Sequence, residues 1–133
     1  MNILSGTITD IKICSALSLV KVETQSITLS SIIIETPNTV DYLKVGNEID
    51  VLFKETEVIL STASSLPISL QNRIPCVIKK IKKGELLCSI ILLFKEEEIT
   101  SIITRNAVNT LGLEEGMEVL AMIKTNEMML AKK

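Results

Sequence analysis

The sequence predicts an all-β protein of two tandem five-stranded barrels, with one short helix in each. Three observations lead to this fold class. A shift of 70 positions aligns residues 1–63 with residues 71–133 of the 133-residue chain without a gap, and about 14 of the aligned pairs are identical. Short runs rich in Val and Ile lie between turn residues, and both halves carry these runs in the same order. The chain therefore reads as a duplicated domain.

Five strands are expected in each repeat, from apolar runs of strand length. In the first repeat these runs are residues 8–13, 17–22, 27–34, 49–53 and 58–60. In the second repeat they are residues 74–81, 86–94, 99–103, 117–123 and 128–130. Three strands, a short helix and two more strands form the order of a small OB-like barrel, so we expect two tandem OB-like barrels.

The short helix is expected between the third and fourth strands of each repeat. In the second repeat, apolar residues in the segment 107–113 follow helical spacing, Thr104 can act as the N-cap and Gly112 can end the helix. The aligned segment of the first repeat is residues 36–43, where Pro37 suits the first helical position. The pattern thus predicts a helix in both repeats.

The repeat divides the chain into a first unit at residues 1–62, a linker at 63–70 and a second unit at 71–133. The linker is rich in serine and is interrupted by Pro67, which is typical of a connecting segment.

Two of the expected strands are apolar on both faces, at residues 89–94 and 119–123. One face of such a strand can fill a barrel, and the other needs a separate cover. Each repeat is also too small to bury much core by itself. Two covers remain open: a further copy of the chain in an oligomer, which we favour, or the other half of the same chain.

Composition excludes several classes of function. The chain has no His and no Trp, its aromatic content is 2%, and its net charge is −2. Without His, a phosphate-binding glycine loop or a nucleophile motif, we expect no enzyme. An acidic chain poor in aromatic residues does not fit direct nucleic-acid binding. The three cysteines lack metal-site spacing, and the sequence shows no membrane span or export signal, so we expect no metal and a cytoplasmic location.

The second repeat carries a linked set of motifs with a family resemblance. The motifs are, in order, Ser69-Leu70-Gln71-Asn72-Arg73-Ile74, Ile81-Lys82-Lys83-Gly84, Ile99-Thr100-Ser101-Ile102-Ile103-Thr104, Leu111-Gly112-Leu113-Glu114-Glu115-Gly116 and Ile123-Lys124-Thr125-Asn126. In order and spacing this set resembles the Mop (TOBE) domain of molbindins. With its tandem copy, the chain resembles a di-Mop molbindin, and also the C-terminal molybdate-binding half of the molybdate-responsive transcription regulator.

The resemblance implies binding of molybdate or tungstate at interfaces between Mop units, for storage, homeostasis or sensing, with no further cofactor. It also implies a homo-oligomer: six Mop units around a ring would make this chain a homotrimer, with a dimer as the alternative. A tetrahedral dianion needs several donors in fixed places, such as backbone N–H groups, hydroxyls and a cation.

The family pattern maps onto specific residues of this chain. The oxyanion-binding residues that the resemblance implies are Ser69, Gln71, Asn72, Thr104, Lys124 and Thr125, with Lys54 as the first-repeat counterpart of Lys124. Each has a plainer explanation: Thr104 can simply cap its helix, the two lysines can be solvated charges at strand ends, and Ser69 can be ordinary linker.

Two positions depart from the family pattern. Gln71 stands where the family usually has Arg, and Glu55 follows Lys54 where the family has Ser. A neutral amide supplies no net charge, and a carboxylate repels a dianion. The alternative function is therefore a ligand-free oligomerisation or interaction module, or a regulatory domain, that has lost its anion site.

Overall fold

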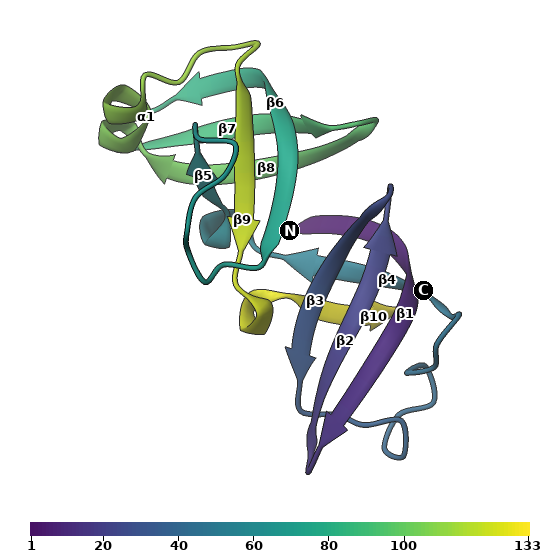
Figure 1. Cartoon of the computed structure of the whole chain (residues 1–133). Coiled ribbons are helices and arrows are strands. Elements are labelled where there is room, and N and C mark those ends of the chain that lie inside the picture. The colour runs from purple at the N-terminus through teal and green to yellow at the C-terminus, as the bar shows by residue number, and fades with distance from the viewer.

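The computed structural model describes residues 1–133 and contains two five-stranded antiparallel sheets that lie next to each other (Figure 1). Sheet A has the strand order β10-β4-β1-β2-β3, and sheet B has the order β5-β9-β6-β7-β8. The strands of the first repeat are β1 (Asn2–Cys14), β2 (Leu17–Thr24), β3 (Ile27–Ile33), β4 (Glu48–Phe53) and β5 (Ile59–Ser61). Those of the second are β6 (Asn72–Lys83), β7 (Leu87–Phe94), β8 (Glu97–Thr104), β9 (Glu118–Ile123) and β10 (Met129–Lys132). The expected two sets of five strands are confirmed.

The duplication is visible in the strand pairing as well as in the sequence. In β1 the register shifts between Ile8 and Asp10, and in β6 it shifts between the aligned residues Ile78 and Lys80. A bulge bends its strand and increases the local twist. β1 pairs with β4 over residues 2–7 and with β2 over residues 7–14, and β6 pairs with β9 over residues 72–77 and with β7 over residues 77–83.

The last strand of each repeat belongs to the sheet of the other repeat. β5 pairs with β9 of sheet B, and β10 pairs with β4 of sheet A. The first sheet therefore contains four strands from the first repeat and one from the second, and the second sheet has the reverse composition. Figure 1 shows the yellow strand β10 beside β4, where it forms one edge of the sheet of the first repeat. Neither barrel is complete without the other half of the chain.

Buried polar side chains fasten this exchange with the same contacts in both halves. The side chain of Asn2 bonds the N–H and C=O of Thr100 at 2.8 and 2.9 Å, and that of Asn72 bonds the N–H and C=O of Ser30 at 2.7 and 2.8 Å. In addition, the hydroxyls of Ser31 and Ser101 donate to the carbonyls before the exchanged strands. Asn2 aligns with Asn72 and Ser31 with Ser101. The sequence identities at these positions therefore correspond to one set of hydrogen bonds, the interlock, that each repeat forms with the other.

One of the two expected α-helices forms. Helix α1 (Arg105–Leu111) is capped by the Thr104 hydroxyl, which accepts from the Ala107 N–H at 3.1 Å, and it ends at Gly112 in the left-handed conformation. The helix expected over residues 36–43 is wrong, because this segment forms only turns. There the Thr39 hydroxyl bonds both the N–H and the C=O of Thr36, which is how Thr competes with helical hydrogen bonding. Two short 3-10 helices, η1 (Glu55–Glu57) and η2 (Thr125–Glu127), follow β4 and β9.

A single apolar cluster of 25 buried residues extends through both halves. Phe53 and Phe94, the largest of its fully buried side chains, come from β4 and β7 respectively. No helix in the structure has the length and apolar character needed to cross a membrane.

The outer face of β9 has a cover of its own. Leu120 and Met122 lie outside the main cluster but are only 7% and 1% exposed. Met122 is paired with Arg73 of β6, so both side chains leave the same face of the sheet, and the Arg73 guanidinium bonds the linker backbone. The linker therefore covers this face. At the matching place on sheet A, Ile3 is 52% exposed and Met129 is 41% exposed, so no segment of the chain covers these two side chains.

Replacement of Gly6 by Ala is expected to lower the free energy of unfolding by about 1–3 kcal/mol, the usual cost of overpacking. A Cβ atom on Gly6 would lie 2.5 Å from the backbone oxygen of Glu23 and 2.6 Å from Cγ1 of Val22. Urea unfolding followed by circular dichroism measures the change, with the exposed Thr7→Ala on the same strand as control. An unchanged midpoint for Gly6→Ala would contradict the close approach of β1 and β2.

Candidate functional site

Four of the residues expected in the oxyanion site line one cavity of about 530 Å³. They are Ser69 and Gln71 from the segment before β6, and Lys124 and Thr125 from the segment after β9. The remaining wall is apolar and comes from both repeats: Leu19, Ile32, Ile68 and Leu70. The cavity thus lies where the second repeat meets the β2–β3 hairpin of the first.

Strand register explains why these residues meet. Asn72 pairs with Ile123 at the ends of β6 and β9, so Gln71 and Lys124, the next residues outward, are neighbours. The Asn72 side chain, 1% exposed, bonds the backbone of Ser30 and so holds β3 against this end of the sheet. Leu19 and Ile32 are directly paired on β2 and β3, which places both at the same wall.

The polar lining of this cavity is suited to an anion. Lys124 is exposed and takes part in none of the three ion pairs of the structure, so its charge has no carboxylate partner. Ser69 and Thr125 contribute hydroxyl donors, and Gln71 contributes an amide donor. The apolar wall is itself partly open to solvent, with Ile32 41% and Ile68 43% exposed, so the polar groups provide the attraction for an anion.

The cavity is larger than one tetrahedral oxyanion requires. A water molecule occupies about 30 Å³ in the liquid, so an ion with four oxygen atoms fills only a fraction of about 530 Å³. The cavity therefore has room for the anion together with water or other groups.

Three of the expected residues are not brought into this cavity. Asn72 lies behind it and its side-chain amide is already bonded at both atoms. Thr104 caps α1. Lys54 precedes η1 at the corresponding position of the first repeat.

The first-repeat counterpart of the cavity differs in charge. Glu55 occupies the position of Thr125, and the N-terminal amino group of Met1 donates a hydrogen bond to its carboxylate. That hydrogen bond holds the pKa of Glu55 below its usual range, so the carboxylate stays charged at neutral pH. The Met1 ammonium group offsets the charge of Glu55, but Glu55 supplies no hydroxyl donor for an anion beside Lys54.

Sequence reasoning missed the apolar wall of the site. Leu70 lies inside the motif that contains Ser69 and Gln71, and Ile68 directly precedes that motif, so their position was available from the sequence. Leu19 and Ile32 carried no such signal, because they come from the other repeat and reach the cavity only through the strand exchange.

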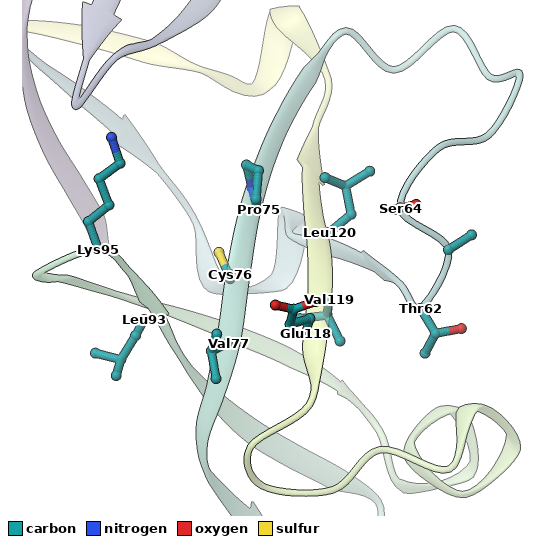
Figure 2. A pocket seen from close by; sticks show the side chains of 11 residues that line it. Thr62, Ser64, Pro75, Cys76, Val77, Leu93, Lys95, Glu118, Val119 and Leu120 are labelled. Atoms are coloured by element: carbon teal, nitrogen blue, oxygen red, sulfur yellow. The ribbon is translucent and has the colours of Figure 1, made fainter.

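A second cavity, of about 430 Å³, lies on the outer face of sheet B between β6, β9 and the linker (Figure 2). Lys95 and Glu118 are its two charged residues, so it has no excess of positive charge. Cys76 contributes to the lining from β6, and burial raises the pKa of its thiol to about 12. The thiol therefore stays protonated at neutral pH and is a poor nucleophile or metal ligand. This cavity fits an oxyanion less well than the first.

We expect one of the three cysteines to react with a disulfide reagent at pH 8 in the native protein. Cys14 is exposed, whereas Cys76 and Cys88 are buried. The reagent 5,5′-dithiobis(2-nitrobenzoate) counts accessible thiolates, and all three thiols should react in denaturant. The Cys14→Ser variant should show no fast reaction; a fast phase remaining in that variant would contradict the burial of the other two.

Comparison with known proteins identifies the domain from which the chain is built. The TOBE domain model matches residues 68–130. Molybdenum-pterin-binding protein 1 of Clostridium pasteurianum is 33% identical over 66 residues, which are 49% of this chain and 97% of that protein. Molybdenum-pterin-binding protein 3 of the same organism is 30% identical over 66 residues, again 97% of its length.

One solved structure matches both repeats together. It is that of the cytoplasmic molybdate-binding protein ModG with molybdate bound, with a TM-score of 0.92, 26% sequence identity, and coverage of 99% of this chain and 96% of that chain. The agreement over both halves includes the relative placement of the two barrels. The chain belongs to the TOBE domain family, and its tandem domains make it a di-Mop molbindin.

Proposed function

We propose that this protein binds molybdate or tungstate in the cytoplasm, for storage, homeostasis or sensing, without changing the anion chemically. The observation that carries the proposal is the cavity in which Ser69, Gln71, Lys124 and Thr125 converge. The name of the similar structure, a cytoplasmic molybdate-binding protein, supports both the ligand and the location. The relatives in Clostridium pasteurianum are likewise named as binding proteins.

In the proposed site, Lys124 provides the fixed positive charge and the other three side chains provide hydrogen bonds. Gln71 donates through its amide without adding charge, so the affinity depends more on Lys124 than it would with Arg at position 71. Asn72 supports the site from behind by holding β3 in place. The proposal leaves Thr104 to a site completed by another Mop unit, and it expects no working site at Lys54, where Glu55 stands in place of the hydroxyl residue.

The proposed assembly is a homotrimer, in which neighbouring chains close the open side of each cavity. Two features support it: the cavity exceeds the size of one oxyanion, and the outer face of sheet A leaves Ile3 and Met129 exposed. Burial of large apolar side chains is the usual reason for stable association of identical chains. Static light scattering counts the subunits, and a dimer is the alternative outcome.

The second candidate function is an interaction module without an anion site. Two observations favour it, the neutral Gln71 in the cavity and Glu55 at the matching place in the first repeat. Such a module would form the same oligomer and bind no oxyanion.

Isothermal titration of the purified oligomer with molybdate, tungstate and sulfate decides between the two functions. The binding protein predicts saturable heat for molybdate or tungstate, a whole-number ratio per oligomer, and a rise in Tm with anion concentration. Sulfate is the control for a tetrahedral dianion of smaller size. The absence of heat and of any Tm shift with both metal oxyanions would leave the interaction module as the function.

A further inference from the structure

Arg73 holds the backbone of the linker at three points. Its Nε donates to the carbonyl of Leu70 at 2.8 Å, its Nη1 to that of Leu66 at 3.0 Å and its Nη2 to that of Ile68 at 2.8 Å. Arg73 takes part in no ion pair, so the three hydrogen bonds of its guanidinium all go to linker carbonyls. The planar guanidinium can bond several acceptors in fixed directions, which a lysine ammonium cannot reproduce.

The segment held in this way forms one wall of the oxyanion cavity. Ile68, Ser69, Leu70 and Gln71 all line the cavity, and no residue between 62 and 71 belongs to a helix or strand. Within residues 66–71 the one backbone hydrogen bond runs from the Ile68 N–H to the Leu66 carbonyl. The wall therefore depends on Arg73 for most of its fixed contacts.

The direction of the bonded carbonyls determines the direction of two N–H groups. In a trans peptide the C=O of one residue and the N–H of the next point in opposite directions. The carbonyls of Ile68 and Leu70 point to Arg73, so the N–H groups of Ser69 and Gln71 point away from it. Neither N–H donates to another backbone group. Free backbone N–H groups in fixed positions are good anion donors.

We propose that Arg73 is the positioning residue of the oxyanion site: by binding three linker carbonyls, it orders residues 66–71 and turns the N–H groups of Ser69 and Gln71 toward the anion. The inference rests on the proposed function and adds a residue that does not line the cavity. It belongs to the second repeat alone, since the aligned residue of the first repeat is Ile3. A preordered wall avoids the entropy cost of ordering the linker on binding.

The test combines hydrogen exchange with anion titration, on the full oligomer. Arg73→Met keeps an unbranched apolar chain as far as the position of Nε and removes all the donors of the guanidinium. We expect faster exchange of the hydrogen-bonded Ile68 amide without anion, unchanged exchange in β7 and β8, and a loss of molybdate affinity of about 10- to 100-fold, the range typical of residues that orient a binding group. Added molybdate should restore part of the protection of the linker.

Two further variants separate positioning from charge. Arg73→Lys keeps the positive charge but not the fork, so it should resemble Arg73→Met, and it serves as the second variant if Arg73→Met does not fold. Lys95→Met removes a cation that bonds a backbone carbonyl elsewhere, that of Gln25, and should bind molybdate like the wild type. Wild-type affinity in Arg73→Lys, or unchanged linker exchange in Arg73→Met, would overturn the positioning role.

The two readouts also distinguish this inference from the proposed function. Exchange of residues 66–71 reports on the linker whether or not an anion binds. If the wild type binds molybdate and Arg73→Met binds it equally well, the positioning role fails and the proposed function stands. If the wild type gives no heat, the proposed function fails, and the role of Arg73 in anion binding fails with it.

Discussion

Replacement of Lys124 by Ala should lower the affinity for molybdate by about 10- to 100-fold, because a hydrogen bond to a charged group contributes about 1.5–3 kcal/mol. Lys124 is the one cation that lines the cavity, so no other positive charge replaces it there. It takes part in no ion pair, so its charge is available to the anion. The side chain is exposed, so its truncation should leave the free energy of unfolding within about 0.5 kcal/mol of the wild type. Titration calorimetry of the folded oligomer measures the affinity.

Lys54→Ala is the matched control, because Lys54 occupies the aligned position of the first repeat. It precedes η1 as Lys124 precedes η2, with the same extended backbone. Glu55 beside it is an acceptor where the second repeat has the Thr125 hydroxyl donor, so we expect affinity and stoichiometry to stay at wild-type values. Equal losses in both variants would show that the two repeats contribute equally, and an unchanged affinity in Lys124→Ala would remove Lys124 from the site.

Replacement of Asn72 by Ala should lower the free energy of unfolding by about 2–4 kcal/mol. The Asn72 side chain bonds both the N–H and the C=O of Ser30, and a buried polar group left without a partner costs about 1–3 kcal/mol. Urea unfolding followed by circular dichroism measures the loss. Because Asn72 holds β3 against the cavity, a modest decrease in molybdate affinity should accompany it.

Asn2→Ala tests the same interlock on the other side of the molecule. Asn2 bonds Thr100 as Asn72 bonds Ser30, so the loss of stability should be similar. Comparison of the two variants distinguishes a structural role of Asn72 from direct contact between Asn72 and the anion. If Asn72 were itself an oxyanion ligand, its replacement would abolish binding while Asn2→Ala preserved it. Little loss of stability in either variant would contradict the interlock.

The strand exchange connects folding to the site. The cavity takes its polar residues from the second repeat and two of its apolar residues from the first. Its assembly therefore requires both halves, fastened by Asn72 and by the hydroxyl of Ser31, which donates to the carbonyl of Met128 at 2.6 Å. A substitution that weakens the contacts between the two halves should therefore lower the affinity for the anion, even when it replaces no residue that lines the cavity.

The expectation for α1 succeeded where that for residues 36–43 failed, and the difference is local. Thr104 and Gly112 supply both ends of a helix, and the residues between them can be helical. Residues 36–43 begin with one turn, in which the Val40 N–H donates to the Thr36 carbonyl, but Tyr42 stands where α1 has Gly112 and the Thr39 hydroxyl binds the backbone of Thr36, so only turns result. Aligned segments of a duplicated domain can diverge in this way because connecting segments tolerate change better than strands do.

By itself the sequence determined the duplication, the ten strands and the helix α1, because each strand or helix depends on residues close together in the chain. The resemblance to the Mop domain pointed to Ser69, Gln71, Lys124 and Thr125, which the structure places at one cavity. The tertiary structure alone decided that β5 and β10 each pair with the sheet of the other repeat and that Leu19 and Ile32 complete the cavity. It also placed Arg73 on the linker backbone. These features depend on contacts between residues far apart in sequence, and two equivalent repeats have the same apolar pattern whether each keeps its last strand or exchanges it.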